Sequence, residues 1–475
     1  MISFRRVSHV PSLCPIREYQ FRYEISNKVQ ASQAFSACQS SLGRASDVKV
    51  SVRSGRGEVQ IEIPKRNLAG VFGPKSPRSK GNTLDELKHA MENPHGPPLA
   101  SLVRGRSVCV LVEDHTREEP RWELINAVLP SLRDASRVQF IITTGSHEVE
   151  HTGNLEILEM INRASKDVGL GSYRVKINDC HDTDVVNLGK THRGTPVIIS
   201  NAAAHHDVYI ALSDMKAHYF GGYSNALKDF LPGVCAFATI EANHSLALDP
   251  RSTFGRHPYH PDENRRDNPL ADDMREAMEI ITRDAKVFAL AIVSDENKLV
   301  WADAGKLQPV IAGGIEVVDE MDSFVVKPVP RVIISPGGYP EDKSLYHAQR
   351  AVELCKNAVA DGGEILLVAE CIDGVAPSEA IENFYKKLTA PLDEVLSSIH
   401  GEYHLYEHKA YKFAELLKRI SRVRMYTNLD SQTVEAAHLE KVDDPQAVVD
   451  EWIGQDPKTK ILVFNKGNKL AVYAK

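Results

Sequence analysis

Apolar and polar residues alternate regularly in the first well-patterned part of the chain. "VKVSV" (48–52) and "EVQIEIP" (58–64) are apolar at every second position, and "SGRG" (54–57) lies between them. A period of two is typical of a strand with one buried face, and a short glycine-bearing segment between two such runs favours a tight turn. The pattern predicts a β-hairpin. Residues 1–47 lack a clear period, and we interpret them as an N-terminal extension of unknown structure.

From residue 107 the pattern changes to continuous apolar runs separated by segments of helical period. The helical segments are 120–134, where Pro120 suits the first turn, and 154–166. Continuous apolar runs indicate strands that are buried on both faces. The predicted strands are "SVCVLVED" (107–114), "RVQFIITTG" (137–145), "YRVKIND" (173–179), "TPVIIS" (195–200) and "HDVYIALS" (206–213).

A second alternation of strands and helices begins near residue 331. Its first helix, 342–361, is expected to end at Gly362 and Gly363. Alternating strands and helices imply parallel pairing, so we predict two Rossmann-like α/β domains, 48–322 and 323–475. The other predicted elements are strands at 331–335, 364–370 and 460–465, and helices at 408–421 and 445–455.

Composition and charge narrow the class of protein. The net charge is −7, which argues against nucleic acid as the main partner, and no apolar run is long enough to span a membrane. The seven cysteines are scattered and include no C-x-x-C pair, as expected of reduced thiols in the cytoplasm. The N-terminus has no apolar segment of the signal-peptide type. We expect a cytoplasmic protein that acts on a small molecule.

Polar residues follow four of the predicted strands at the points where those strands end. In an open parallel sheet, ligands bind beyond the carboxyl ends of the strands. The four strand ends therefore direct their polar residues toward one shared cleft. These residues are Asp114, Thr116 and Arg117 after the first strand, His147 after the second, His218 after the third, and the Gly337–Gly338 turn after the fourth.

Several of these residues also have a structural interpretation. Asp114 and Thr116 can cap the helix that opens at Pro120, and Arg117 can form a surface ion pair. The Gly337–Gly338 turn can cradle a phosphate, although the G-x-G-x-x-G spacing of dinucleotide-binding folds is missing.

Two further histidines, His257 and His260, lie in "GRHPYHPDENRRDNP" (255–269). Their spacing resembles that of metal ligands, but the polar composition of the segment favours a solvated loop.

The stretch "KAHYFGGYSNALKDFLPG" (216–233) places Lys228 ten residues after His218, and His244 follows sixteen residues later. Histidine is the natural acid or base near neutral pH and a good ligand for nickel or zinc. Lysine is the residue that binds cofactors covalently. A lysine between two histidines, with a third histidine at another strand end, predicts a cofactor-dependent enzyme.

Ordered motifs over most of the chain carry a family resemblance. They are "GRGEVQIEIPKRNLAGVF" (55–72), "DHTREEP" (114–120), "TTGSH" (143–147), "HYFGGYSNALKDFLPG" (218–233) with "NH" (243–244), "NPLADDMREA" (268–277) and "PGGYPEDKSLYHAQR" (336–350). With these motifs, the chain from about residue 48 onward resembles the lactate racemase family, whose enzymes use a nickel-pincer nucleotide.

The resemblance implies an active site in the cleft between the two domains. Lys228 would form the thioamide bond to the pyridinium mononucleotide, His244 would ligate nickel, and His147 and His218 would be the acid/base pair. The resemblance further implies two kinds of partner: enzymes that make the cofactor and enzymes that insert nickel. Three residues would bind the cofactor phosphate or the substrate: Asp114, Thr116 and Arg117.

The resemblance also implies inversion at C2 of a 2-hydroxy acid by reversible hydride transfer. A hydride route suits this chemistry because the α-hydrogen of a hydroxy-carboxylate is too weakly acidic for simple proton abstraction by histidine. One histidine would remove the hydroxyl proton as hydride leaves carbon, and the second would supply a proton when hydride returns to the other face.

The substrate-facing positions depart from the lactate-specific pattern. His347 and Arg350 replace a Gln and a Lys, and His408 stands where the family has a closing aromatic residue. Glu148 departs from the family's T-H-R, and Asn225–Ala226 replaces a Gly-Gly pair before the lysine. We therefore expect a substrate more polar than lactate: Arg350 favours a dicarboxylate such as malate, whereas the two histidines and Glu148 favour a sugar acid.

Two other classes of enzyme remain open at this point. One is a nicotinamide-dependent 2-hydroxyacid dehydrogenase, against which the missing G-x-G-x-x-G counts. The other is a zinc-dependent hydrolase or lyase that uses His147, His218 and His244.

Overall fold

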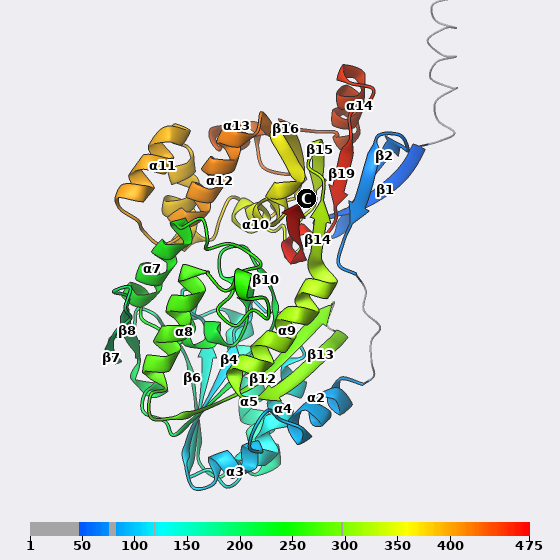
Figure 1. The fold of residues 1–475 in the computed structure, drawn as a ribbon. Coiled ribbons are helices and arrows are strands. Elements are labelled where there is room, and N and C mark those ends of the chain that lie inside the picture. Colours follow the sequence, from blue (N-terminus) through cyan, green and yellow to red (C-terminus); the bar gives the residue numbers. More distant parts are fainter. Residues whose placement is uncertain (1–46, 76–81, 118, 296–297) are drawn as a thin grey trace, which may run out of the picture.

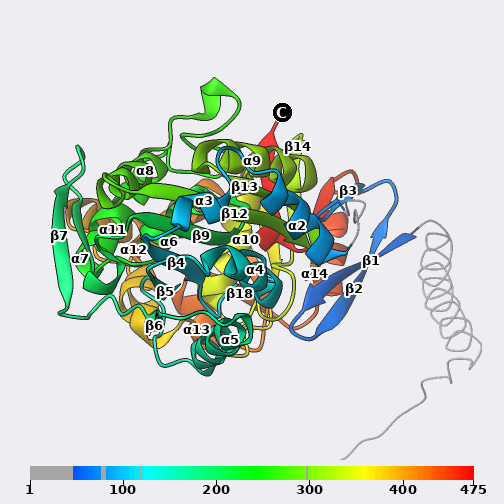
Figure 2. The same ribbon diagram turned by 90° about the horizontal axis from the view of Figure 1, so that it is seen from below.

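Two six-stranded sheets, each at the centre of one lobe, organise the molecule (Figures 1 and 2). A computed structural model describes residues 47–475 apart from 76–81, 118 and 296–297. The expected α/β fold is confirmed. Helix α9 (Leu307–Asp322) leads from the first lobe to strand β14 (Ser323–Val326) in the second.

The sheet of the first lobe is parallel except at one edge. Its strand order is β13-β12-β9-β4-β5-β6, and only β13 runs antiparallel to its neighbour. All residues of β4 and β9 are buried, which explains their continuous apolar runs. The strands are β4 (Ser107–Glu113), β5 (Arg137–Thr143), β6 (Tyr173–Ile177), β9 (Val208–Asp214), β12 (Lys286–Asp295) and β13 (Lys298–Gly305).

Helices cover both faces of this sheet. One set of helices packs in a core with Val108, Val110 and Val112 of β4. A second set packs on the opposite face, with Cys109 and Leu111. The first set is α2 (Thr83–Glu92), α3 (Leu99–Val103), α4 (Arg121–Val128) and α5 (Thr152–Val168). The second set is α6 (Leu227–Phe230), α7 (Phe237–Ser245), α8 (Pro269–Ile281) and α9.

The sheet of the second lobe is wholly parallel, in the order β18-β17-β16-β15-β19-β3. Its strands are β3 (Leu68–Phe72), β15 (Val329–Ile334), β16 (Val359–Val368), β17 (Arg422–Tyr426), β18 (Glu440–Val442) and β19 (Ile461–Phe464). Its helices are α10 (Leu345–Cys355), α11 (Leu392–Gly401), α12 (Glu407–Arg419), α13 (Ser431–Ala436) and α14 (Pro445–Gln455). Strand β14 pairs with β20 (Ala471–Ala474) outside this sheet.

The N-terminal hairpin belongs to the second lobe and not, as the sequence suggested, to the first. Strands β1 (Asp47–Ser54) and β2 (Gly57–Pro64) form the expected hairpin, and their buried residues pack against Trp452 of α14. Strand β3 pairs in parallel with β19 at the edge of the second sheet. The predicted first domain therefore differs from the observed lobe over residues 47–72.

Three further predictions of elements differ from the structure. Helix α10 ends at Cys355, and Gly362 and Gly363 lie inside strand β16, not at a helix end. The predicted strand 195–200 is β8 (Pro196–Ser200), which pairs antiparallel with β7 (Val185–Lys190) outside the main sheet. Strands β12 and β13 were not predicted.

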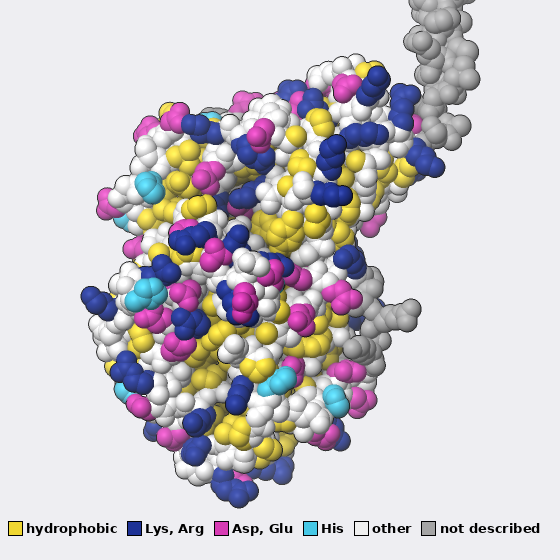
Figure 3. All heavy atoms as spheres, in the orientation of Figure 1, with side chains coloured by type: hydrophobic (Ala, Val, Ile, Leu, Met, Phe, Trp, Pro, Cys, Tyr) yellow, Lys and Arg dark blue, Asp and Glu magenta, His cyan; other side chains and the backbone are white. Residues whose placement is uncertain are grey.

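The surface narrows between the lobes on the face shown in Figure 3. Basic and acidic side chains are interspersed over the first lobe on this face. Within the described ranges, no helix combines the length and the apolar character needed to cross a bilayer.

Candidate active site

The carboxyl ends of the first sheet's strands open onto a cavity of about 490 Å³ that residues of both lobes line. The structure brings together every residue that the sequence singled out as catalytic, cofactor-binding, metal-binding or substrate-binding. These residues are Asp114, Thr116, Arg117, His147, His218, Lys228, His244, His347, Arg350 and His408.

Asp114 and His147 form a dyad at the ends of β4 and β5. The Nδ1–H of His147 donates to the Asp114 carboxylate over 2.8 Å, and the Thr116 hydroxyl donates to its other oxygen over 2.6 Å. Asp114 is 2% exposed, and burial alone would raise its pKa, but His147 and these bonds hold the pKa below its ordinary value. In the neutral ring, a proton on Nδ1 leaves Nε2 as the acceptor.

The capping interpretation of Asp114 and Thr116 is wrong. Helix α4 begins after Pro120 and no side chain caps its N-terminus. Arg117 does form an ion pair, 3.4 Å from Glu113, but this pair is largely buried at the cavity and does not lie on the surface.

His218 and Lys228 form a second pair within hydrogen-bonding distance. His218 ends the short strand β10 (Lys216–His218), and its Nε2 lies 3.1 Å from the Lys228 Nζ. The Gly221 amide donates to His218 Nδ1 over 3.1 Å, so Nδ1 is the acceptor and Nε2 carries the proton of the neutral ring. Burial, together with Arg117 and Arg350 nearby, holds the pKa of Lys228 well below its ordinary value. Because Nε2 of His218 carries the proton, the amine accepts this bond, which only its neutral form can do.

The glycine pair in this stretch is needed for the chain to turn. Gly222 begins strand β11 (Gly222–Ser224) with φ +77°, and a Cβ there would lie 1.8 Å from the Arg256 carbonyl oxygen. Only glycine fits this close backbone approach. Asn225–Ala226, which replaces the family's Gly-Gly pair, fits the backbone here, because Ala226 is right-handed (φ −55°) and Asn225 accepts a bond from the Leu227 amide.

His244 lies near the end of α7 and lines the same cavity. Burial, with Lys228 nearby, lowers its pKa to about 3, so the ring is neutral at physiological pH. Its Nδ1 is buried without a hydrogen-bond partner among the described residues. The ring packs against Phe220 and His408. A neutral imidazole fixed by packing is suited to bind a metal.

Helices α10 and α12 form the cavity wall of the second lobe. Arg350 donates to the Ala217 carbonyl of the first lobe over 3.0 Å, while its Nε is buried without a partner among the described residues. His347 bonds through Nδ1 to Ser344 over 2.7 Å. His408 is engaged at both ring nitrogens by tyrosine hydroxyls: Nε2 lies 3.2 Å from Tyr219 and Nδ1 lies 2.7 Å from Tyr403.

Several cavity residues that carry charge or a hydroxyl group had no role assigned from the sequence. Lys216 and Glu341 lie near strand ends and could have been found by the same argument that found His147. Tyr219 and Tyr346 lie inside the family motifs, where nothing marked them as cavity residues, and Lys409 lies outside every motif. The residues without an assigned role include Lys216, Tyr219, Glu341, Tyr346 and Lys409.

Two other expectations about polar residues are wrong. His257 and His260 are buried: Asn225 contacts His257 Nε2 at 3.1 Å, and His260 faces Asp319 at 3.4 Å. The Gly337–Gly338 turn packs against the N-terminal hairpin and does not line the cavity, since a Cβ on Gly338 would lie 2.6 Å from the Gly55 carbonyl oxygen.

Comparison with known proteins agrees with this arrangement. The lactate racemase N-terminal domain matches residues 54–255, and the lactate racemase C-terminal domain matches residues 326–470. The chain belongs to the lactate racemase family. The two matched regions contain every residue that the sequence singled out at the cavity.

Similar proteins cover most of the chain. A lactate racemase of Thermoanaerobacterium thermosaccharolyticum is 28% identical over 353 residues, which is 72% of this chain and 79% of that protein. A lactate racemase of Lactiplantibacillus plantarum is 27% identical over 341 residues, 70% of this chain and 76% of that protein. These relatives support a racemase function, and thus an isomerase, for the family member described here.

Solved structures show the same fold. The lactate racemase apoprotein from Thermoanaerobacterium thermosaccharolyticum has a TM-score of 0.78 at 24% identity, over 90% of this chain and 100% of that chain. A protein from Thermotoga maritima has a TM-score of 0.59 at 14% identity, over 83% of this chain and 98% of that chain.

Proposed function

We propose that this racemase inverts C2 of a polar 2-hydroxy acid with a nickel-pincer nucleotide bound to Lys228. The observation that carries the proposal is the pairing of a buried, neutral lysine with His218 in the same cavity as the Asp114–His147 dyad. When bound, the cofactor supplies the reversible hydride acceptor that amino-acid side chains lack.

The residues present fit this cofactor. A neutral Lys228 amine is the nucleophilic form that a covalent bond to a cofactor requires. His244 offers one neutral imidazole to the cavity, and no group of three or more His, Cys, Asp or Glu in the described part of the chain could hold a metal ion by itself. A single histidine suits a nickel ion whose other ligands belong to the cofactor.

The two histidines can serve as an acid/base pair that shares one proton. For one enantiomer, His147 Nε2 would accept the hydroxyl proton, and Asp114 would stabilise the imidazolium that forms. His218 would begin this turnover as the imidazolium and return its Nε2 proton to the substrate oxygen, because a neutral ring that lost this proton would become an imidazolate. The other enantiomer would use the pair with the two charge states exchanged.

The wall of the second lobe supports a polar substrate. Arg350 carries an unpartnered Nε and can bind the substrate carboxylate through two parallel hydrogen bonds. His347 lines the cavity beside it. Burying these donors against the methyl group of lactate would leave them unpaired, at a cost of roughly 1–3 kcal/mol each.

The two alternative classes have less support. A zinc hydrolase using His147, His218 and His244 needs three free ligands, but His218 is bonded to Gly221 and Lys228. A nicotinamide dehydrogenase needs a glycine turn that contacts the phosphates of the dinucleotide. The Gly337–Gly338 turn packs against the hairpin instead.

Intact-mass measurement and nickel analysis test the proposal directly. The chain co-expressed with the cofactor-making enzymes should carry one added mass on Lys228. Lys228→Ala should lose this mass and the bound nickel, because the attachment nitrogen is gone. Lys216→Ala should keep the mass even though Lys216 lines the same cavity. Full nickel content in Lys228→Ala would contradict the assignment.

A further inference from the structure

Lys409 is a buried cation in the cavity wall that neither the sequence motifs nor the proposed reaction uses. It is 5% exposed, and its Nζ donates to the Tyr346 carbonyl over 2.7 Å. The same Nζ lies 3.8 Å from the ring centroid of Tyr346 and 5.1 Å from that of Tyr219. Two ring faces and one carbonyl thus contact the ammonium group.

No carboxylate of the described residues pairs with Lys409, which distinguishes it from two other cations of the cavity, Arg117 and Lys216. Arg117 is paired with Glu113 at 3.4 Å, and Lys216 lies 3.9 Å from Asp214. Burying an ammonium without a counter-ion costs free energy that one carbonyl and two ring faces offset only in part. The burial, with Arg350 nearby, lowers the pKa of Lys409 well below its ordinary value. A carboxylate that binds beside Lys409 would raise this pKa again and favour the charged ammonium form.

Lys409 and Arg350 lie on adjacent helices, α12 and α10, and both line the cavity. The Arg350 Nε lacks a partner, as described above. A substrate with one carboxylate can satisfy one of these two cations. A substrate with two carboxylates can satisfy both.

The hydrogen bonds of His408 weaken the case for a sugar acid. Tyr219 and Tyr403 occupy both of its ring nitrogens, so it has no free group for a substrate hydroxyl. Of the three residues that favoured a polyol, one is therefore unavailable. Glu148 lies at the cavity rim, where its side chain is exposed, and it forms no ion pair with Lys409.

We propose that Lys409 binds the second carboxylate of a 2-hydroxy dicarboxylate and so selects this substrate class over monocarboxylates. The Tyr219 and Tyr346 rings hold the ammonium group in place, and Arg350 binds the carboxylate next to the reacting carbon. This inference rests on the proposed function. A cofactor phosphate offers the same anionic chemistry, and the experiment separates these two sources.

The experiment uses cofactor-loaded protein and two four-carbon probes that do not react, succinate and butyrate. Calorimetry should show that Lys409→Met weakens succinate binding by roughly 30-fold or more, because a buried charge pair is lost, while butyrate binding stays unchanged. Turnover of malate should fall in parallel, whereas turnover of lactate should not fall. The added mass and the nickel content should match those of the wild type.

Lys412→Met is the matched control. Lys412 lies one turn further along α12, is also buried, and donates to the Ser252 carbonyl over 3.3 Å without lining the cavity. This variant removes a buried lysine from the same helix and should leave the preference for succinate intact. If both variants lost this preference equally, the preference would depend on helix α12 as a whole and not on Lys409, and the proposal would be wrong.

Three other outcomes also decide the matter. Unchanged succinate affinity in Lys409→Met overturns the assignment of Lys409, whether or not the protein racemises any substrate. Loss of the added mass in this variant assigns Lys409 to the cofactor phosphate instead. A succinate preference that depends on Lys409, without racemisation of any 2-hydroxy acid, supports the binding site and contradicts the proposed function.

Discussion

The Asp114–His147 hydrogen bond is the contact on which the proposed acid/base chemistry depends most directly. We expect Asp114→Asn to lower kcat by roughly 10²–10⁴-fold, because a neutral amide neither fixes the tautomer of His147 nor stabilises its protonated form. The added mass and the nickel content should be retained. Steady-state kinetics beside intact-mass measurement checks both expectations.

Asp207→Asn is a suitable control for this variant. Asp207 accepts bonds from Ser107 at the opposite end of β4, away from the cavity. Its substitution should leave kcat unchanged. Wild-type turnover in Asp114→Asn would show that His147 does not need its carboxylate partner.

The contrast between His147 and Lys409 shows which site residues a sequence can reveal. His147 follows a strongly apolar run, so its place at a strand end could be predicted from the pattern of one segment. Lys409 lies in "HKAYKFAELLKRIS", where lysines at helical spacing usually face solvent. Its burial depends on Tyr219 and Tyr346, which come from distant parts of the chain. Such contacts follow from tertiary packing and not from local pattern.

At the scale of elements, the strands buried on both faces were the most predictable. The runs that form β4, β5 and β9 could be located because apolar residues follow one another without a break at the centre of each. The end of α10 could not be located, because Gly362 and Gly363 resemble a helix stop. In the structure a Cβ on Gly363 would lie 2.7 Å from the Pro330 carbonyl oxygen, so this glycine permits close strand pairing instead.

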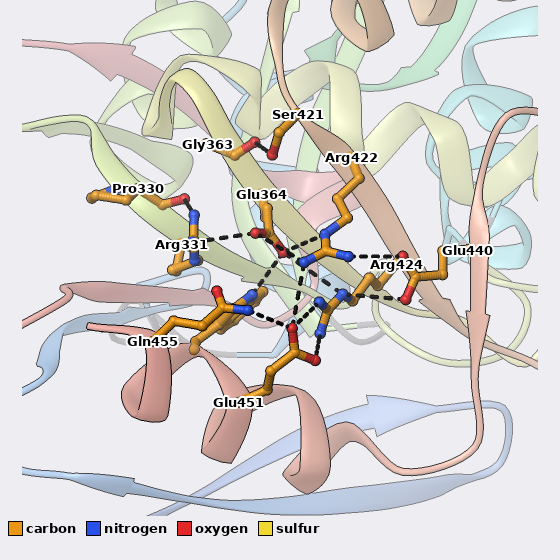
Figure 4. Close-up of polar contacts among 11 residues, drawn as sticks. Pro330, Arg331, Gly363, Glu364, Ser421, Arg422, Arg424, Glu440, Glu451 and Gln455 are labelled. Atoms are coloured by element: carbon orange, nitrogen blue, oxygen red, sulfur yellow. Dashed lines mark hydrogen bonds and ion pairs between the residues drawn. The ribbon is translucent and has the colours of Figure 1, made fainter. Parts of the chain in front are cut away.

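Glu364 of β16 connects three neighbouring strands of the second sheet through a network that Figure 4 shows. Its carboxylate accepts bonds from Arg422 at 2.9 Å and from the Trp452 indole at 2.8 Å, and it lies 3.2 Å from Arg331. We expect Glu364→Gln to lower the free energy of unfolding by about 1–3 kcal/mol, because the buried Trp452 indole and two arginines lose their charged acceptor. Urea denaturation measures this change. Glu451→Gln, whose side chain is 45% exposed, should cost less.

The contribution of Glu364 should depend on pH. Burial alone would raise its pKa, but Trp452, Arg422 and Arg331 lower it below the ordinary value. A carboxyl whose folded pKa is depressed stabilises the protein above its unfolded pKa of about 4.3, and this stability is lost as pH falls through the folded pKa. The difference between wild type and Glu364→Gln should therefore shrink below about pH 4.3. A difference that stays constant to lower pH would contradict this account.

At the scale of the whole molecule, the order of the chain and the arrangement of the lobes do not coincide. The hairpin β1–β2 and strand β3 precede the first lobe in sequence but complete the second. Sequence periodicity could identify the hairpin, because alternation is a local property. It could not assign the hairpin to a lobe, because that depends on packing against Trp452 and Val463, which lie near the other end of the chain.

This arrangement predicts that a substitution near the start of the chain loosens the last elements. Ile61 of β2 is fully buried and packs in one cluster with Val463 of β19 and Trp452 of α14. Ile61→Ala should lower the free energy of unfolding by roughly 2–5 kcal/mol, through lost apolar contact and the cavity that remains. Hydrogen exchange should become faster first in β19 and α14, and later in β4 and β5, which have a separate core. Gln60→Ala, at the exposed neighbouring position, should change neither quantity. If exchange became faster only in β4 and β5, the stability of the hairpin would be coupled to the first lobe, which would contradict the observed packing.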